Sequence, residues 1–412
     1  MNFKSLLLGS AAAIVLASGA QAADLTVAEP VDYVKVCDAF GAGFFYSPGT
    51  DTCIKVGGYV EFGTSFGDND FGSFNRLYKD SNWGNFYTEV SIQLTASSVT
   101  EYGNLTGFID MRAKTGNKAG ETGTFSDLVN ESTNSAYVDS AYLELGPIKA
   151  GYFTSLFDFG RGYDDTGMFG SDSTVDHIQL TYAVNGFGLS LSVEDQRDRN
   201  AFGYGLLDGV ERGNDNIPDV VAAVTYSSGI FSAKVAGAYV NQAYDWDNYD
   251  SKVGWAIGGG LEVALDNISA GDRFFVSASY GDNANSFTGI SGGTSVAGTV
   301  GFDNEGSSFA GSSWSALASY KHVWTPQLWS SLSGGYASYE GSDNLDGAKI
   351  DAWRVGFNTA YAPVKGLQLV ADVFYTDVDA KGFANSQSGS DVGGIDGDGS
   401  SWTANLFLQR SW

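Results

Sequence analysis

Hydrophobic and polar residues alternate along most of the chain, in short runs bounded by Gly, Pro, Asn and Asp. In the run 53–64, Val60 and Phe62 fall on one face, whereas Tyr59 and Glu61 fall on the other. A period of two is typical of a strand with one face against an apolar environment and the other against water. Sixteen such runs occur, at 53–64, 85–96, 104–114, 136–145, 148–153, 177–184, 187–195, 219–226, 230–240, 253–264, 272–280, 312–324, 327–339, 349–361, 366–376 and 400–412. The pattern predicts an all-β chain.

The connections between these runs alternate in length. Short turns are expected at 146–147, 185–186, 227–229, 325–326 and 362–365, and long polar loops at 65–84, 115–135, 154–176, 196–218, 241–252, 281–311, 340–348 and 377–399. Asn185-Gly186 is a strong hairpin signal. An even number of antiparallel strands with loops sorted by length is typical of an outer-membrane β-barrel, and sixteen strands leave a water-filled lumen. We therefore predict a sixteen-stranded antiparallel transmembrane β-barrel with short periplasmic turns and long extracellular loops.

The final run, 400–412, has Trp402, Leu406 and Leu408 on one face, with Phe407 as an apolar exception on the other. A strand that ends the chain in this way needs partners on both edges, which a closed barrel supplies. The aromatic residue at the last position resembles the assembly signal of bacterial outer-membrane barrels. A last strand in a soluble sandwich has the same local pattern, but a sandwich would not sort its loops by length.

The first residues predict export. Lys4 precedes an apolar stretch at 6–17, and Ala20-Gln21-Ala22 forms a small-residue cleavage site, so we expect a signal peptide over 1–22. We expect a periplasmic lead-in over 23–52 and the barrel over 53–412. No later stretch approaches the roughly 18 to 20 apolar residues of a membrane helix. The exported protein is therefore either soluble or crosses a membrane as strands.

Composition is compatible with both choices until the phase of the aromatic residues is considered. The chain is 43% hydrophobic with a mean hydropathy of −0.10, and a barrel has such values because only alternate residues face lipid. The aromatic residues near strand ends mostly share the apolar phase: Tyr226, Tyr239, Trp255, Tyr280, Trp314, Tyr320, Trp329, Tyr336, Trp353, Tyr361, Tyr375, Trp402 and Trp412. β-Propensity alone explains their number but not their phase, so we predict aromatic girdles at the membrane interfaces.

The formal net charge is −26, which excludes a strongly basic nucleic-acid-binding surface. The acidic residues are concentrated in the expected loops, where they predict a negative pore mouth, unless they only confer solubility. The acidic segments 245–250 and 391–399 could bind Ca²⁺ or bridge loosely to lipopolysaccharide, although neither matches an EF-hand.

The only two cysteines are Cys37 and Cys53, and an exported protein matures where disulfides persist. We expect a Cys37–Cys53 disulfide that closes a loop in the lead-in. Two cysteines and the distant His177 and His322 do not form a ligand set, so neither a metal site nor a cofactor is expected. Neither histidine lies in a nucleophile motif, and the glycine-rich stretch 254–260 lies within a strand, so we expect no enzyme.

One stretch carries a specific resemblance. The segment YVKVCDAFGAGFFYSPGTDTCIKVGGY at 33–59 closely resembles the porin family of alphaproteobacteria, and KAGYFTSLFD at 149–158 looks like the entry to that family's third loop. The similarity runs over the whole chain. It implies a trimeric barrel in the outer membrane, in contact with lipid and lipopolysaccharide, with passive diffusion of small hydrophilic solutes and ions. One departure is Arg410, where such barrels often carry an aromatic residue.

The resemblance also implies that the third loop folds into the lumen and narrows it. Loop 154–176 carries Asp158, Asp164, Asp165, Asp172 and Asp176 against a single Arg161. The basic residues in the lumen phase of the wall are Lys55, Arg112, Lys149, Lys234, Arg273 and Arg354. Acids on the loop facing bases on the wall would create a transverse field, and the acidic excess predicts a weak preference for cations. The alternative is that each charge is only a solvated residue.

The sequence leaves three candidate functions for the protein. The leading prediction is a general diffusion porin. A substrate-selective channel, for example for sugars, would need aromatic residues along the lumen, and Tyr59, Tyr87 and Phe108 leave that possibility open. An adhesin or receptor anchored by its barrel would need one very large loop, which the chain lacks.

Overall fold

The computed structural model describes residues 36–70, 81–116, 134–195, 211–212, 218–242, 244–245, 252–290, 311–342, 347, 349–381 and 397–412. The expected signal peptide, the first part of the lead-in and much of the long loops, including most of both acidic segments, lie outside these residues.

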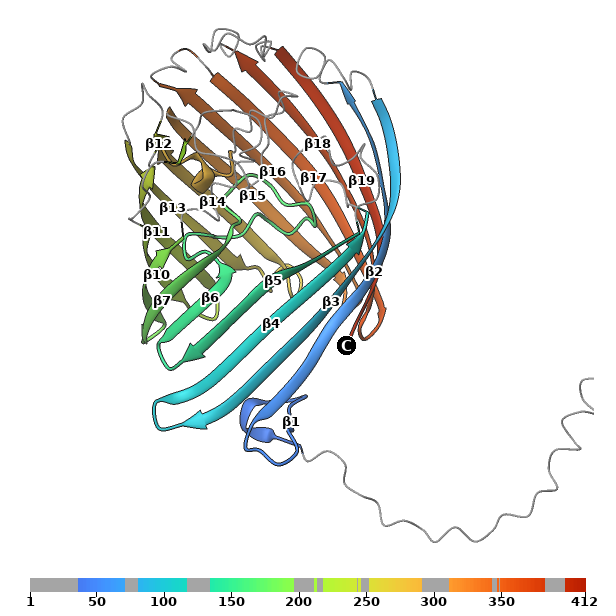
Figure 1. Cartoon of the computed structure of the whole chain (residues 1–412). Coiled ribbons are helices and arrows are strands. Elements are labelled where there is room, and N and C mark those ends of the chain that lie inside the picture. The colour runs from blue at the N-terminus through green and yellow to red at the C-terminus, as the bar shows by residue number, and fades with distance from the viewer. Residues whose placement is uncertain are drawn as a thin grey trace, which may run out of the picture.

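Sixteen antiparallel strands form one sheet that closes on itself as a barrel (Figure 1). They are β2 (Cys53–Asp70), β3 (Ser81–Thr100), β4 (Gly103–Thr115), β5 (Asn134–Leu145), β6 (Ile148–Thr154), β7 (Thr174–Val184), β8 (Phe187–Glu194), β10 (Asp219–Ser227), β11 (Phe231–Gln242), β13 (Lys252–Ala264), β14 (Arg273–Asp282), β15 (Gly311–Thr325), β16 (Leu328–Gly341), β17 (Lys349–Val364), β18 (Leu367–Lys381) and β19 (Gly397–Ser411). The barrel closes where β19 pairs with β2, from Ser400↔Asp70 to Ser411↔Tyr59. The short strands β9 (Glu211–Arg212) and β12 (Tyr244–Asp245) pair with each other outside this sheet. No helix among the described residues is long and apolar enough to cross a membrane.

The predicted fold class is confirmed, and each of the sixteen predicted runs is a strand. The largest errors lie at strand ends. β2 continues to Asp70 and β18 to Lys381, beyond the predicted ends at 64 and 376. Residues such as Gly67 and Asp68 are typical of turns, but here pairing with β3 and β19 on both edges holds them in the sheet. Tertiary pairing therefore overrides a weak local preference.

The alternation places apolar side chains outside and polar side chains inside. On β2, Val60 and Phe62 are 40% and 53% exposed, whereas Glu61 between them is 6% exposed. The same phase continues on β19, where Leu406 and Leu408 face outward and Phe407 faces the interior. The outward face suits lipid because its side chains are apolar. The closed barrel also pairs all of its strand backbone groups, as a structure built of strands must do at membrane depth.

The short turns lie at one end of the barrel, the end that is periplasmic in outer-membrane barrels (Figure 1). At the turn between β7 and β8, Asn185 has a φ of 51° and Gly186 a φ of 81°. Two consecutive residues with positive φ define the tight hairpin that Asn-Gly favours, so this predicted hairpin is confirmed.

The lead-in packs below this end of the barrel. The Cys37–Cys53 disulfide is present, with a Cα–Cα distance of 6.0 Å, as predicted. A short strand, β1 (Phe45–Tyr46), pairs with the start of β2, and η1 (Asp38–Phe40) precedes it. The disulfide therefore ties the lead-in to the first strand of the barrel.

Nine of the outward aromatic residues form a continuous row near the extracellular end. It runs Tyr239, Trp255, Tyr280, Trp314, Tyr336, Trp353, Tyr375, Trp402 and Phe66, from β11 through β13–β19 to β2, each residue a register partner or ring neighbour of the next. Side chains of this kind anchor a barrel at the headgroup level. Trp329 is an exception to the predicted phase, because it faces the interior and packs beside Tyr87, Val370 and Phe407.

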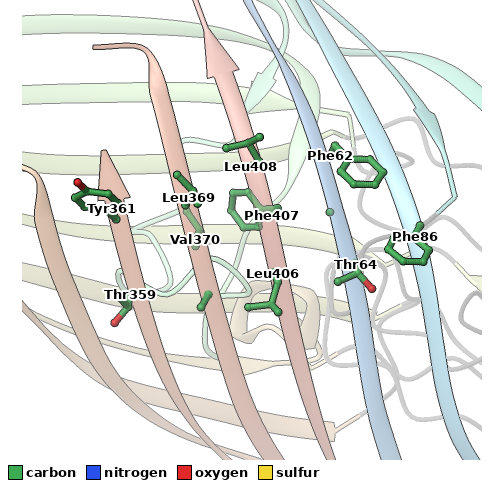
Figure 2. Close-up of a pocket in the computed structure, with 12 residues that line it drawn as sticks. Phe62, Thr64, Phe86, Thr359, Tyr361, Leu369, Val370, Leu406, Phe407 and Leu408 are labelled. Atoms are coloured by element: carbon green, nitrogen blue, oxygen red, sulfur yellow. The ribbon is translucent and has the colours of Figure 1, made fainter. Parts of the chain in front are cut away.

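A groove on the outer wall lies below this row. Figure 2 shows its lining across β17, β18, β19, β2 and β3, where Tyr361, Leu369, Leu406, Leu408 and Phe62 surround small residues. The lining is mostly apolar, and its large side chains belong to the outward phase except for Val370 and Phe407, which face the interior. The groove therefore belongs to the membrane-facing surface and is separate from the channel.

Candidate channel constriction

The connection between β6 and β7 enters the lumen. We call residues 155–173 loop 3; in Figure 1 it is the green trace that crosses the inside of the barrel. Its two ends are held together by Ser155, whose N–H donates to the carbonyl of Ser173 at 2.8 Å. The carboxylate of Glu194 on β8 accepts from Ser155 Oγ at 2.8 Å and from the N–H of Leu156 at 3.0 Å. Glu194 is fully buried, so it fixes the point where the loop turns inward.

Loop 3 then follows the wall formed by β11 and β13–β18. Lys234 Nζ donates to the carbonyl of Asp158 at 2.7 Å, and Tyr163 donates its hydroxyl to Glu262 at 2.7 Å. Further along, Arg354 donates to the carbonyl of Gly167 at 3.2 Å. Burial, followed by the bond to Glu262, raises the pKa of Tyr163, so this hydroxyl stays protonated and remains a donor. We call the inward faces of β11 and β13–β18 the covered wall.

The tip of the loop reaches the strands near the closure of the barrel. Ser331 Oγ donates to Asp164 at 2.5 Å, and Thr166 donates its hydroxyl to Asp372 at 2.5 Å. Asn405 on β19 donates to the same hydroxyl at 3.3 Å. Burial raises the pKa of Asp164, and hydrogen bonds from Ser331 and Ser333 oppose that shift.

Glycines on the covered wall make room for the loop. A Cβ at Gly258 would lie 2.8 Å from the ring of Phe159, and a Cβ at Gly335 would lie 3.3 Å from Met168 and Phe169. The glycine-rich stretch 254–260 therefore has a packing role, because its inward members leave space for an aromatic side chain of loop 3.

A second segment also folds inward, which sequence analysis did not predict. Residues 284–290, which include η3 (Asn285–Thr288), follow β14. All seven residues from Ala284 to Ile290 are buried. Phe287 packs edge to face on Phe157 of loop 3, with ring centroids 4.9 Å apart, in a cluster with Val221, Ala238 and Ala256. The segment supports loop 3 from the extracellular side of β13 and β14.

The inward faces of β3–β6, which we call the open wall, carry large polar side chains. Arg112 on β4 lies between two carboxylates, 3.2 Å from Asp110 and 2.9 Å from Asp139. A β-bulge on β5 makes this arrangement possible, since Asp110 pairs with Ser140 and the next residue, Met111, pairs with Val138. Asp139 is the extra residue, and the bulge turns it toward the lumen. Tyr59 of β2 lies under the guanidinium of Arg112 and donates to Glu89.

The open wall and loop 3 approach each other at Asp172. Its carboxylate forms an ion pair with Arg161 at 2.7 Å and remains 54% exposed. Asp172 is also close enough to Asp139 for the two charges to repel each other. This part of the lumen therefore contains three ion pairs, namely Arg112 with Asp110, Arg112 with Asp139, and Arg161 with Asp172.

The other predicted site residues divide into three groups. Asp158 and Asp164 have partners within the protein. Asp158 accepts hydrogen bonds from Ser171 and Ser173, and Asp164 packs against the wall and is 7% exposed. Asp165 is exposed on the loop, whereas Asp176 lies in β7 opposite Tyr152, in the outward phase of Ile178 and Leu180. Of the six wall bases, the structure brings only Arg112 to the gap opposite Asp172.

The remaining wall bases have other surroundings. Lys55 lies over the ring of Phe44 at the lead-in, and Arg273 pairs with Asp266 in a periplasmic turn. Lys234 and Arg354 lie under loop 3 on the covered wall. Lys149 lies 3.6 Å from the centroid of Tyr142 and 4.0 Å from that of Phe153, and Phe108 stacks on Tyr142 at 5.1 Å. These four side chains form an aromatic patch on the open wall.

No group of three or more His, Cys, Asp or Glu side chains among the described residues is arranged to hold a metal ion. His177 is buried, with Nδ1 at 2.9 Å from the carbonyl of Val175, and His322 contacts Asp272 on the outer face near a periplasmic turn.

A closed sixteen-stranded barrel with a lumen narrowed by its third loop defines a channel-forming outer-membrane protein. Residues 24–403 match the family described as the Porin subfamily, and the chain belongs to that family. The predicted family and the predicted outer-membrane location are confirmed. The chain is 37% identical to Porin Omp2b of Brucella suis biovar 1 over 257 residues, which cover 60% of this chain and 68% of that protein. It is 34% identical to Porin Omp2b of Brucella abortus over 309 residues, 66% of this chain and 83% of the other.

Solved structures share the fold at low sequence identity. The outer-membrane channel DcaP of Acinetobacter baumannii matches with a TM-score of 0.65 and 15% identity, over 89% of this chain and 99% of that one. An anion-selective porin from Comamonas acidovorans matches with a TM-score of 0.51 and 12% identity, over 88% of this chain and 100% of that one. These similarities concern the fold, so ion preference has to be argued from this chain's own charges.

Proposed function

We propose that this outer-membrane porin is a general diffusion channel for small hydrophilic solutes and ions, with a weak preference for cations. The observation that carries the preference is the approach of Asp172 on loop 3 to Asp139 on the open wall. Each carboxylate has an arginine partner, so the gap contains both signs of charge and does not exclude either ion. The net charge of −26 adds a long-range attraction for cations. That attraction extends about 10 Å at 0.1 M salt and weakens as salt increases.

The direct test is a recording from the purified protein in a planar bilayer. The reversal potential in a KCl gradient should have the sign of a cation-preferring channel, and its magnitude should fall as the total salt concentration rises. Anion preference at low salt would contradict the proposal. Liposome swelling with sugars of increasing size would measure the size limit for solutes in the same preparation.

We also propose that the protein functions as a homotrimer. The support is the extent of the aromatic row, which covers β11, β13–β19 and β2 and does not continue across the described outward positions of β4–β8. Most outward positions of those strands hold smaller or aliphatic side chains such as Val138, Leu143 and Ile178, and the exposed Tyr182 and Phe187 lie beside the periplasmic turn at 185–186. A lipid-facing sector needs interfacial anchors, whereas a sector covered by neighbouring subunits does not. Extraction in mild detergent should give a trimer by light scattering, and a monomer would contradict this part.

A second candidate is a substrate-selective channel. The aromatic patch of Phe108, Tyr142 and Phe153 with Lys149 favours it, because flat rings beside a hydrogen-bond donor bind sugars. In this case a sugar or aromatic anion would block ion current at low concentration, and Tyr142→Ala would remove the block. Unchanged current across a panel of such solutes would leave general diffusion as the function.

A further inference from the structure

The tip of loop 3 covers a row of inward polar side chains that crosses five strands, from β16 to β2. The row consists of Ser331, Asn358, Asp372, Asn405 and Ser65, each the register partner of the next. None of the five is more than 2% exposed. The region is therefore a buried polar layer between the loop and the wall, and each of its polar atoms needs a partner.

Several oxygens in this layer have donors. Asp164 Oδ1 accepts from Ser331, and Asp372 Oδ2 accepts from both the hydroxyl and the N–H of Thr166, at 2.5 and 3.1 Å. Asn405 Oδ1 accepts from Ser65 at 2.6 Å. These bonds fix the orientation of both carboxylates, one from the loop and one from the wall.

Three oxygens in the same layer have no donor. Asp164 Oδ2, Asn358 Oδ1 and Asp372 Oδ1 are buried and lack a hydrogen-bond partner among the described residues. Their side chains are 7%, 1% and 0% exposed, respectively. An uncompensated buried acceptor costs about 1–3 kcal/mol, and more when it is charged. Three such acceptors together require an explanation.

The three oxygens belong to neighbouring positions. Asn358 and Asp372 are register partners on β17 and β18. Ser331, which holds Asp164, is the partner of Asn358 on its other side. The negative charges of Asp165 and Asp164 both act on the carboxylate of Asp372, so the carboxylates at the loop tip and on the wall repel each other. Gly356 completes the arrangement, because any Cβ there would overlap Asp164 Oδ2.

We propose that Asp164 Oδ2, Asn358 Oδ1 and Asp372 Oδ1 bind one hard divalent cation of the Ca²⁺ type between the tip of loop 3 and the barrel wall. Carboxylate and amide oxygens are the ligands that Ca²⁺ prefers, and water completes its coordination shell. The ion offsets the repulsion between the two carboxylates and attaches the loop to β17 and β18. Two carboxylates and one amide from positions 164, 358 and 372 leave no local motif, so sequence analysis predicted no metal site.

A bound cation and its alternatives predict opposite effects of one substitution on the stability of the protein. A proton shared by Asp164 and Asp372, or a buried water, would also supply the missing partners. A third carboxylate at position 358 distinguishes them. Asn358→Asp adds a charged ligand for a cation, but adds only repulsion if a proton or a water occupies the layer.

The test measures thermal unfolding of the purified protein, stripped with EDTA, as CaCl2 is added. Wild type should gain several degrees in its midpoint, since a ligand that binds only the folded state stabilises it by mass action. Asp372→Asn and Asp164→Asn should lose this gain, and Asn358→Asp should reach half of its gain at a roughly tenfold lower CaCl2 concentration. Asp164→Asn lies on the loop and alters no strand, so it keeps the test valid if a wall variant fails to fold.

Acidic extracellular segments could also bind Ca²⁺, so a matched control is needed. Asp176→Asn removes an exposed carboxylate just after loop 3 and should keep the full wild-type gain. Equilibrium dialysis with radioactive calcium should show one ion fewer per chain in Asp164→Asn than in Asp176→Asn. Equal calcium binding by these two variants, or an Asn358→Asp variant that is destabilised equally with CaCl2 and with EDTA, would overturn the proposal.

Discussion

The two sides of the lumen are built from different side chains. Many inward positions of the covered wall are small, and these include Ala236, Ala256, Gly258, Ser279, Ser315, Ser319, Ser333 and Gly335, although larger side chains such as Lys234, Phe275 and Arg354 lie among them. Inward positions of the open wall are large and mostly charged or aromatic, and include Glu89, Asp110, Arg112, Tyr137, Asp139, Tyr142 and Lys149. Both walls satisfy the same period-two pattern.

The difference follows from what each wall contacts. On the covered wall, loop 3 and residues 284–290 supply much of the bulk, and small residues such as Gly258 and Gly335 leave room for them. On the open wall the structure describes no such inner layer, and charged side chains such as Arg112 and Asp139 pair with one another. A run of small side chains at inward positions therefore indicates where a barrel wall packs against an inserted loop.

The largest expected effect comes from adding bulk to the covered wall. Gly258→Val should push Phe159 and loop 3 into the lumen or off the wall, because its Cβ would lie 2.8 Å from that ring. Overpacking of this kind costs about 1–3 kcal/mol. We expect a lower unfolding midpoint and a changed single-channel conductance. Gly107→Val on the outward face of β4, where a Cβ meets only ordinary contact with Leu143 at 3.7 Å, is the control for replacing a strand glycine. Equal effects of the two variants would show that the loss of the glycine, and not the contact with loop 3, causes the change.

A second prediction compares an arginine on each wall. Arg112→Gln leaves Asp110 and Asp139 without their cationic partner and should strengthen cation preference. A unit charge at about 8 Å in water is worth roughly 0.5 kcal/mol for each ion, with opposite sign for cations and anions. Screening at about 0.1 M salt reduces this energy by about half, which leaves about a twofold change in the ratio of cation to anion permeability. Arg354→Gln, under loop 3 on the covered wall, should change that ratio less and lower the unfolding midpoint more. Reversal potentials and thermal unfolding of both variants measure the comparison.

A third prediction separates the aspartates of loop 3 from one another. Asp172→Asn should weaken cation preference by a similar factor of about two, because its carboxylate is half exposed at the gap. Asp158→Asn should leave the reversal potential nearly unchanged and reduce stability instead, because its carboxylate accepts from Ser171 and Ser173 within the loop. The opposite order of effects in the salt gradient would show that the buried end of the loop controls ion passage.

The smallest effect on permeation is expected from the disulfide, which lies outside both walls. Replacing Cys37 and Cys53 together by Ser should cost roughly 3 kcal/mol in the chain-entropy account of a loop of this size. Conductance and reversal potential should stay at wild-type values, since the lead-in packs at the periplasmic end. A change in selectivity would place the lead-in in the ion path.

Most of the fold could be predicted from the sequence, because a period of two reports directly which face of each strand is apolar. The hairpin at Asn185-Gly186 and the Cys37–Cys53 pair also follow from local chemistry. The site was harder, because alternation does not report what contacts an inward residue. The sequence predicts that Asp158 and Asp164 line the pore, but their carboxylates accept hydrogen bonds from loop 3 and from the wall, respectively.

Two features of the site had signals that could have been used. The inward Gly258 and Gly260 within a strand indicated that something packs closely there, and that partner is Phe159. The run before the turn at 146–147 contains one residue too many for a regular pairing, which is the bulge that directs Asp139 to the gap. Residues 284–290 had no comparable signal, because their burial depends on contacts with loop 3 that are distant in sequence.

The pairing of β19 with β2 joins residues from opposite ends of the chain. Ser65 and Asn405, which meet across this seam, are 340 positions apart in the chain. Contacts of such separation form slowly, since the whole intervening chain has to be ordered or confined first. Thr166 at the tip of loop 3 binds Asn405 and Asp372 beside the same seam. Closure of the barrel and docking of loop 3 against the wall are therefore coupled, and the constriction is incomplete until β19 has paired with β2.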